Sequence, residues 1–341
     1  MKTRWTTSDI CKLFRLNESS KTPIIYAEEK GDIPKAERFA RGRIMVREWT
    51  SAQLPLIGEK FGFLKKPPKQ AIICTYTPKG GVIKTTFSVN LARALAINGI
   101  KTLVVGLDFQ QSLTRYVLPD TLIKSVDEIG KEQKLGLYHI LYEKAPIKNI
   151  IQHTDLPTLD IIPETTDLNF MAKKMRIDNR REYIIAERLI PYLKEYDVII
   201  FDCNPGWSDL TENALVASNS IVMPIACETE CLEALQANLN EITDFQTTMK
   251  LKWDNFYLIP TLLEHNSISQ NIYASYLNMF KDSIISIPIR RSVSAQEARL
   301  NKLSIIEYDP KSNLAQDYYE VISDLWHKLT NGAEHEQKRN H

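Results

Sequence analysis

The chain has 341 residues, of which 43% are apolar and 25% are charged, as in an ordinary globular protein long enough to bury a core without disulfides. Its 43 Lys and Arg nearly balance its 42 Asp and Glu, which excludes a protein that is basic throughout. The charge is uneven, because residues 1–70 carry 15 basic and 8 acidic side chains while the other 271 carry 28 and 34. We therefore expect two modules, of which the basic one is a candidate for binding nucleic acid.

The sequence also indicates a compartment. It contains no run of about 18 apolar residues, so no membrane span is expected, and its first residues lack the apolar segment of a signal peptide. The five cysteines are scattered, and the one close pair, Cys227 and Cys231, has no second pair with which to hold zinc. This usage is typical of reduced thiols in a cytoplasmic protein.

A small basic module is predicted over residues 1–64. Thr6 and Asp9 have the spacing of a reciprocal helix N-cap, and a second helix is expected to start at Ser19–Ser20 and to end at Gly31. Arg41-Gly42-Arg43 has the pattern of a hairpin tip between short strands, and a further helix follows. This order is that of a winged helix-turn-helix. The alternative is a basic helical cap packed on the next domain.

The segment 65–70 is predicted to be a linker, because it contains two adjacent prolines and three lysines. Beyond it, residues 71–330 alternate apolar runs with helical patterns, and residues 331–341 read as a polar tail. The alternation predicts a doubly wound α/β fold with a mainly parallel sheet. The expected strands are Ala71–Tyr76, Thr102–Leu107, Leu159–Ile162, Val198–Phe201, Ser220–Met223, Phe256–Ile259 and Ile284–Ile287.

The first of these strands leads through a glycine turn into a helix predicted over Thr85–Asn98. Gly80 and Gly81 allow a tight turn that aims backbone N–H groups inward, and the helix start adds a positive dipole end where phosphates bind. Lys84 can reach terminal phosphates, and the Thr85 hydroxyl can ligate Mg²⁺. The alternative is a glycine turn with two solvated lysines. The residues expected to hold a nucleotide are Lys79, Gly80, Gly81, Val82, Ile83, Lys84, Thr85 and Thr86.

Two carboxylates follow later strands. Asp108 ends the second strand, where a side chain faces the ligand crevice of a parallel sheet, or else caps the next helix. Asp202 follows the apolar run Val198–Phe201, as in a Walker B strand that holds the Mg²⁺ shell.

Taken together, these motifs resemble those of the ParA/MinD family of ATPases. Lys-Gly-Gly-x-x-Lys-Thr at 79–85 is similar to the deviant Walker A motif of that family, with Pro78 and Ile83 where the ordinary motif has glycine. The family pattern Asp-x-Asp-Pro-Gln is matched by Asp108 and Gln110 but not by Gly106 and Phe109, and Asn204 replaces a proline after the Walker B aspartate. The resemblance covers roughly residues 70–330, and it implies a deviant P-loop NTPase fold that uses ATP/ADP and Mg²⁺.

The resemblance implies a role for each residue. Lys79 would reach across an ATP-sandwiched dimer to the partner's phosphates, and Lys79, Lys84 and Asp108 would be catalytic. Asp108 would position the attacking water or a Mg²⁺-bound water. The metal site would thus consist of Thr85, Asp108 and Asp202, and Pro288 would lie near the adenine base.

The implied function is ATP-driven plasmid partition. The chain would dimerise on ATP, bind DNA without sequence preference in the nucleoid, and hydrolyse ATP weakly until a ParB-like centromere-binding partner stimulates it. Arg290 and Arg291 are the expected contacts to non-specific DNA.

The basic module resembles the DNA-reading segment of large, self-regulating plasmid ParA proteins. That resemblance implies binding to the protein's own operator as a repressor. The residues expected to enter the major groove are Ser19, Ser20, Lys21 and Thr22, and those expected on phosphates or in the minor groove are Arg38, Arg41 and Arg43.

Two alternatives differ in class. A MinD-like membrane regulator would end in a basic amphipathic helix, whereas the predicted final helix, Ala315–Lys328, carries Asp317, Glu320 and Asp324. A nucleotide-switched transcriptional repressor with a degenerate, non-hydrolysing ATP site is kept open by Pro78, Ile83, Gly106 and Asn204. Turnover of ATP separates the repressor from the enzyme.

Overall fold

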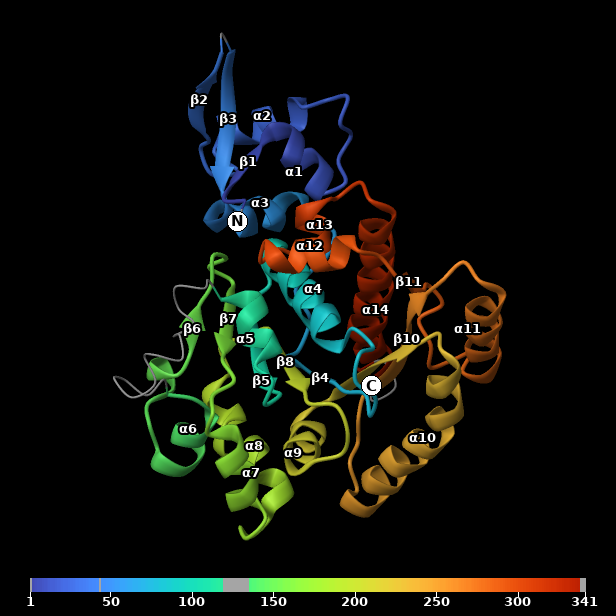
Figure 1. Cartoon of the computed structure of the whole chain (residues 1–341). Helices are drawn as coiled ribbons and strands as arrows, with labels where there is room; N and C mark the ends of the chain where they lie inside the picture. Colours follow the sequence, from blue (N-terminus) through green and yellow to red (C-terminus); the bar gives the residue numbers. More distant parts are fainter. Residues whose placement is uncertain (1, 43, 119–134, 338–341) are drawn as a thin grey trace.

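The computed structural model describes residues 2–42, 44–118 and 135–337 (Figure 1). The N-terminal module contains a three-stranded antiparallel sheet of order β1-β3-β2. Its elements are β1 (Arg4–Thr6), α1 (Thr7–Leu13), α2 (Thr22–Lys30), β2 (Glu37–Arg41), β3 (Ile44–Thr50), η1 (Ser51–Gln53) and α3 (Leu54–Phe61). The predicted order of two helices, a hairpin and a further helix is present, and strand β1 was not predicted.

Of the three helix ends predicted in this module, the start of α1 and the end of α2 are confirmed. Thr6 and Asp9 form a capping box, in which the Asp9 N–H donates to Thr6 Oγ1 at 3.2 Å and the Thr6 N–H donates to Asp9 Oδ2 at 2.8 Å. Gly31 ends α2 in the left-handed conformation, with φ 77°. The predicted start of α2 at Ser19–Ser20 is wrong, because the Ser20 N–H closes a turn onto the carbonyl of Asn17, and the helix begins only at Thr22.

The large sheet has eight strands in the order β11-β10-β9-β4-β8-β5-β7-β6, and its strand pairs are parallel except for β6 with β7. The doubly wound fold is thereby confirmed. The strands are β4 (Ala71–Thr75), β5 (Thr102–Leu107), β6 (Gln152–His153), β7 (Leu159–Ile162), β8 (Val198–Cys203), β9 (Ser220–Ala226), β10 (Asn255–Leu263) and β11 (Ile289–Arg290).

The strand predicted at Ile284–Ile287 is wrong. Ile284 forms an isolated bridge with Leu258, and pairing with β10 resumes only at β11, where Thr261 pairs with Ile289 and the register shifts before Leu263 pairs with Arg290. Pro288 lies between the two stretches, and because proline has no N–H it cannot donate to a sheet ladder.

Helices cover both faces of the large sheet, as continuous apolar strands require. One face packs against α4 (Lys84–Ile97), α5 (Ser112–Val117), α12 (Ser294–Leu300), α13 (Ile305–Tyr308) and α14 (Asn313–Gln337). The other packs against α6 (Leu137–Glu143), α7 (Leu168–Met175), α8 (Ile184–Arg188), α9 (Asp209–Ala217), α10 (Thr229–Met249) and α11 (Ser267–Met279), with short turns η4 (Ile147–Asn149), η5 (Arg181–Tyr183) and η6 (Ile190–Tyr192) between them.

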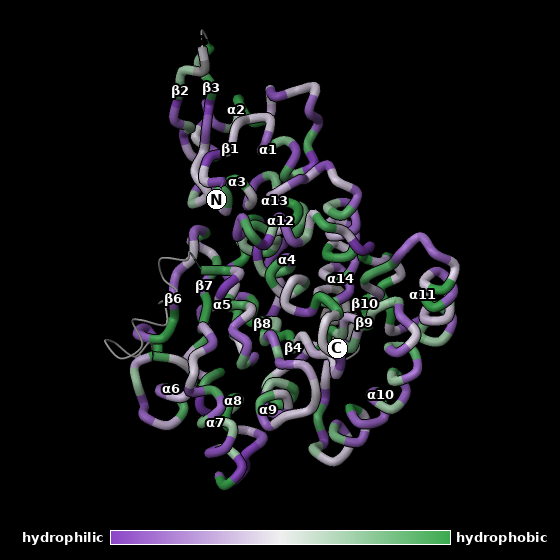
Figure 2. The backbone as a smooth tube through the Cα atoms, viewed as in Figure 1, coloured by the Kyte–Doolittle hydropathy of each residue, from purple (hydrophilic) through white to green (hydrophobic). Residues whose placement is uncertain are grey.

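Figure 2 shows hydrophilic and hydrophobic residues interleaved along α10, an outer helix with one buried stripe. The last helix, α14, extends past the predicted end at Lys328 to Gln337, into the stretch expected to be tail. Among the described residues, no helix is both long and apolar enough to cross a membrane.

The N-terminal module shares one hydrophobic cluster with α4 and α14. The contact to α4 is close, since a Cβ on Gly58 would lie 1.8 Å from the carbonyl oxygen of Ile97. Asn98, next along the chain, accepts a hydrogen bond from the Leu64 N–H at 3.0 Å. On α14, Tyr319 donates to the Leu13 carbonyl at 2.6 Å. The module is therefore packed directly on the helix that follows the glycine turn.

The segment 65–70, predicted to be a linker, is anchored along its length. The indole N–H of Trp326 donates to the Lys65 carbonyl at 2.8 Å, and Lys69 pairs with Asp254 at 2.8 Å. Gln70 donates to the carbonyls of Leu193 and Tyr196, each at 2.8 Å. These contacts fix the path of the chain from the module into β4.

Candidate active site

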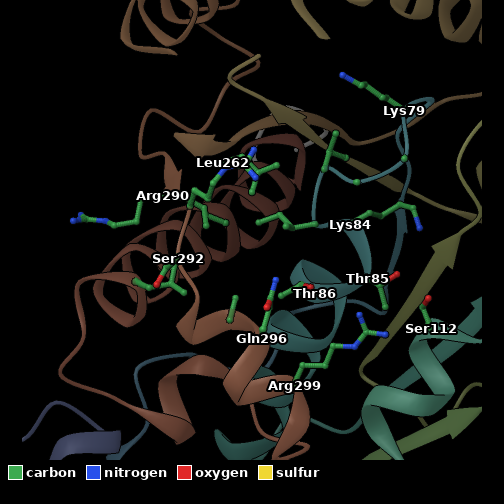
Figure 3. Close-up of a pocket in the computed structure, with 18 of the residues that line it drawn as sticks. Lys79, Lys84, Thr85, Thr86, Ser112, Leu262, Arg290, Ser292, Gln296 and Arg299 are labelled. Carbon is green, nitrogen blue, oxygen red and sulfur yellow. The ribbon is translucent and has the colours of Figure 1, made fainter. Parts of the chain in front are cut away.

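A cavity of about 440 Å³ opens at the carboxyl edge of the central strands, where parallel sheets bind ligands (Figure 3). One wall is the loop between β4 and α4 together with the ends of β5 and β8, and the other comes from β11, α12 and α14. The lining residues are Lys79, Gly80, Gly81, Val82, Ile83, Lys84, Thr85, Thr86, Asp108, Ser112, Pro205, Leu262, Ile289, Arg290, Arg291, Ser292, Ala295, Gln296, Arg299, Leu314 and Tyr318. All eight residues predicted for the phosphate loop are among them.

The loop turns into α4 through two left-handed residues. Gly81 has φ 82°, which glycine adopts freely, but Ile83 has φ 59° and ψ 24°. A β-branched side chain in this region costs on the order of 1–3 kcal/mol and persists only where its surroundings hold it. Here Ile83 packs against the cluster of Val82, Ala226, Cys231 and Leu262. Ile83 thus holds a backbone conformation that glycine adopts more readily, and it lines the cavity without closing it.

Asp202 is the buried centre of the site, with no exposed surface. Its Oδ2 accepts from the Thr85 hydroxyl at 2.7 Å, its Oδ1 accepts from the Ser88 hydroxyl at 2.8 Å, and the Lys84 Nζ lies 3.4 Å from Oδ1. The ammonium and two hydroxyls balance the cost of burying this carboxylate. Ser88 was not predicted, although it lies one helical turn after Lys84 and so shares a face of α4 with it.

The oxygen atoms of Thr85 and Asp202 suit a magnesium ion that takes its remaining ligands from phosphate groups and water. Mg²⁺ takes oxygen ligands and keeps several waters, with one or two protein groups and substrate phosphates. The Thr85 hydroxyl donates its hydrogen bond to Asp202, so its oxygen keeps lone pairs free for such a cation. No cluster of three or more His, Cys, Asp or Glu side chains suited to a metal occurs within residues 2–42, 44–118 and 135–337, so a cation here would depend on phosphate and water.

Asp108 lines the cavity from the end of β5 and also holds its own loop. Its Oδ1 accepts from the Gln110 N–H at 2.9 Å, and its carbonyl accepts from the Gln111 N–H at 3.0 Å. Asp108 therefore faces the crevice as predicted, whereas the alternative, a cap on the next helix, is not formed: the N-cap residue of α5 is Gln111, which makes no side-chain cap bond. The turn leads directly into α5 at Ser112.

Glu164, which follows β7, brings a further buried carboxylate to this region. Its side chain accepts from the N–H groups of Leu113 at 3.2 Å and Thr114 at 2.8 Å, and from the Thr114 hydroxyl. Burial raises the pKa of Glu164 to about 7, and the negative charge of Asp202 adds to the rise. A Cβ on Gly106 would lie 2.4 Å from the Glu164 Cδ, so this carboxylate fills the space that a side chain at 106 would need.

Lys79 points away from Lys84, at the outer rim of the cavity (Figure 3). Its Nζ lies 3.3 Å from Glu228 Oε2 and 3.7 Å from Glu230 Oε2. Glu228 also accepts from Arg291 Nη2 at 2.7 Å, and Arg291 Nε lies 2.7 Å from Glu264. Lys79 therefore belongs to a surface network of charges in this structure.

The far wall was largely missed from the sequence. Tyr318 is fully buried and lines the cavity, and its hydroxyl has no hydrogen-bond partner within the described part of the chain. Gln296 and Arg299 extend from α12 toward the phosphate loop (Figure 3). Pro288 is not a lining residue; the segment that begins beside it, Ile289–Ser292, is. No sequence motif marks this wall, because α12 and α14 are distant from the phosphate loop in the chain and are brought to it only by folding.

The residues predicted to contact DNA lie at two places. Ser19, Lys21 and Thr22 are exposed, and Ser20 half-buried, in the turn that leads into α2. Arg38 is exposed on β2, Arg41 ends that strand, and Arg43 lies outside the described residues.

The other two, on β11 and just after it, are ion-paired. The side chain of Arg290 forms two hydrogen bonds with Asp317, at 2.7 and 2.8 Å, and Arg291 pairs with Glu228 and Glu264. Contact with DNA would require these pairs to open.

Comparisons with known proteins agree with this geometry. A family model described as an AAA domain matches residues 70–254. The sporulation initiation inhibitor protein Soj of Bacillus subtilis is 32% identical over 255 residues, which are 74% of this chain and 97% of Soj. The chromosome partitioning protein ParA of Myxococcus xanthus is 30% identical over 263 residues, 76% of this chain and 89% of that protein.

Among solved structures, a plasmid partition protein of Borrelia burgdorferi B31 bound to AMPPNP has the same fold. Its TM-score is 0.61 at 24% identity, and the match covers 76% of this chain and all of that one. About a quarter of the present chain therefore lies outside each of these alignments.

Proposed function

Because the chain belongs to the ParA/Soj family of P-loop ATPases, we propose that it is an ATP-driven partition protein for plasmid DNA. It dimerises on ATP with Lys79 of each subunit on the other's phosphates, binds DNA without sequence preference, and hydrolyses ATP slowly until a ParB-like partner stimulates it. It acts in the cytoplasm, on the nucleoid. The observation that carries the proposal is that buried Lys84 and half-buried Thr85 both contact the buried carboxylate of Asp202 beneath a cavity of phosphate-loop residues.

Each residue then has a physical task. The loop N–H groups and the start of α4 bind phosphate oxygens, and Lys84 supplies a cation at the terminal phosphates. Thr85 and, through water, Asp202 hold Mg²⁺, which when bound neutralises charge on the phosphate oxygens. Asp108 orients the attacking water from the end of β5. The structural neighbour bound to AMPPNP supports a nucleotide as the ligand.

The N-terminal module, residues 1–64, is proposed to be a winged helix-turn-helix that binds the protein's own operator. Its support is the excess of basic residues, the exposed Lys21 and Arg38, and the hairpin of β2 and β3 that stands out from the molecule (Figure 1). In this proposal ADP favours the operator-bound form, and ATP favours the partition form.

A second candidate is a nucleotide-switched repressor that does not hydrolyse ATP. The left-handed Ile83 and the bare Gly106 favour it, since both depart from the family's motifs at the phosphate site. ATP turnover by the purified protein on plasmid DNA separates the two candidates.

The test of the proposal is DNA binding with ATP, with ADP and with AMPPNP, on the protein's own promoter and on random DNA. Two modes are expected: promoter binding with ADP, and sequence-independent binding with ATP or AMPPNP. A single mode that is indifferent to nucleotide would contradict the partition function and favour a plain repressor.

A further inference from the structure

We propose that Glu164 is a positioning residue of the ATPase site. Its buried carboxylate anchors the start of α5, and thereby the loop that carries Asp108. This carboxylate occupies the space in which the family's pattern has a side chain at position 106. This inference rests on the proposed ATPase function.

The anchoring is reciprocal and local. The carboxylate of Glu164 accepts from the Leu113 and Thr114 N–H groups and from the Thr114 hydroxyl, while the Glu164 N–H donates back to Thr114 Oγ1 at 2.9 Å. The N–H groups of a helix's first turn have no partner within the helix, so an outside acceptor fixes where that turn lies. Glu164 is 3% exposed, so water does not compete for these bonds.

The anchored turn is joined closely to Asp108. Four residues, Asp108 to Gln111, separate the end of β5 from the start of α5, and Gln111 is held in the left-handed conformation with φ 56°. One end of this loop is fixed by the sheet ladder between β5 and β8. The other end is fixed by Glu164, so the position of the Asp108 carboxylate depends on both.

Glu164 also occupies a defined place beside Asp202. Gly106 pairs with Asp202 in the parallel register of β5 and β8, so side chains at the two positions would share one face of the sheet. A Cβ at 106 would lie 2.4 to 2.8 Å from Glu164 Cδ, Cγ and Oε1. A side chain at 106 and the present position of Glu164 therefore exclude each other.

The glycine at position 106 and the buried Glu164 together replace one carboxylate of the family's pattern with another. The family's pattern has a carboxylate on β5 at position 106, and this chain has glycine there with a carboxylate that enters the same space from beyond β7. The site keeps an acidic group beside Asp202, but here the group also ties α5 to β7. Neither residue can be changed alone without loss, whereas a paired change can be accommodated.

The test compares Glu164→Ala, Gly106→Asp and the double variant with the full-length wild type. Glu164→Ala is expected to lower kcat for ATP hydrolysis by about tenfold or more while changing the Kd for ADP by less than about threefold, since the phosphate loop is untouched. Gly106→Asp alone is expected to lower kcat and to unfold more easily, because of the close contact. The double variant is expected to regain the stability that Gly106→Asp loses, because the space is then free, while its kcat stays low because α5 remains unanchored.

Asp160→Asn is the matched control, because Asp160 is a buried acid on β7, the strand that Glu164 follows, and its carboxylate instead accepts from the Tyr196 hydroxyl at 2.7 Å. It is expected to lower stability with kcat near that of wild type. An Asp160→Asn protein that loses as much kcat as Glu164→Ala, or a double variant as unstable as Gly106→Asp, would overturn the inference.

A second readout does not depend on turnover. Amide hydrogen exchange at Leu113 and Thr114 is expected to accelerate by about tenfold or more in Glu164→Ala, because both N–H groups lose their acceptor. Unchanged exchange at these amides would overturn the anchoring role. A wild type that hydrolyses no ATP would instead contradict the proposed function, and the exchange rates would still decide whether Glu164 anchors α5.

Discussion

The ammonium of Lys79 lies 3.3 Å from the carboxylate of Glu228, and this ion pair holds the lysine side chain at the rim of the cavity, turned away from Lys84. Glu228 precedes α10 and also binds Arg291. In a dimer closed on ATP, Lys79 would have to leave this carboxylate for a phosphate of the other subunit. Glu228 therefore competes with the nucleotide for the same cation.

The first prediction concerns this competition. Glu228→Gln is expected to raise the fraction of dimer formed with AMPPNP, because Lys79 loses its main anionic partner, and Lys79→Ala is expected to abolish the dimer while leaving ADP binding intact. Sedimentation velocity measures both. Glu230→Gln is the matched control, since Glu230 lies farther from Lys79, at 3.7 Å, and is 74% exposed. Normal AMPPNP dimers in Lys79→Ala would remove its role across the interface.

The second prediction concerns Lys84. Lys84→Ala is expected to abolish measurable ATP binding, because the terminal phosphates lose their only buried cation among the described lining residues. Isothermal titration calorimetry provides the measurement. Lys173→Ala, on the exposed side of α7, is expected to bind as the wild type does. Tight ATP binding by Lys84→Ala would show that the phosphates lie elsewhere.

The third prediction separates binding from chemistry at Asp108. Asp108→Asn can keep the acceptor for the Gln110 N–H, so the loop should retain its shape while the negative charge is lost. Its kcat is expected to fall by about 10²-fold, typical for loss of a catalytic base, with ATP affinity little changed. Single-turnover hydrolysis beside equilibrium nucleotide binding measures the two effects. Equal losses in both would remove the catalytic role of Asp108.

The fourth prediction concerns the basic module. The double change Arg41→Ala and Arg43→Ala is expected to weaken binding to the protein's own promoter and to reduce the slope of log K against log salt by about 2, because each arginine would neutralise one phosphate. Gel shifts at several salt concentrations give this slope. Arg180→Ala, whose side chain pairs with Glu187 far along the chain, is the control. An unaltered slope would remove the hairpin from the DNA interface.

The fifth prediction concerns the contact between α3 and α4. Gly58→Ala is expected to lower the free energy of unfolding by about 1–3 kcal/mol, because its Cβ would overlap the Ile97 carbonyl and backbone cannot yield cheaply. Leu56→Ala, on the exposed side of the same helix, is expected to change it by less than about 0.5 kcal/mol. Denaturant unfolding measures both. A Gly58→Ala protein as stable as the wild type would show that the contact is soft.

What the sequence could predict was what is encoded locally. The glycine turn from β4 into α4, the strands β4, β5 and β8 and the Thr6 capping box depend on residues close in the chain, and they are confirmed as structure. Glu164 and Tyr318 reach the site only because β7 and α14 are brought there by the sheet order, so no local pattern pointed to them. The strand predicted at 284–287 failed because apolar residues do not show that Pro288 interrupts the ladder.

Helix α4 joins the two halves of the molecule end to end. Its 14 residues, about 21 Å at 1.5 Å each, begin at the phosphate loop and end at Ile97 and Asn98, which contact Gly58 and Leu64 of the N-terminal module. Such a rod cannot shift at one end without moving the other. The two halves are therefore not interchangeable parts: a head transplanted from a distant relative would need a glycine where Gly58 meets the Ile97 carbonyl and a backbone N–H placed to donate to the Asn98 side chain.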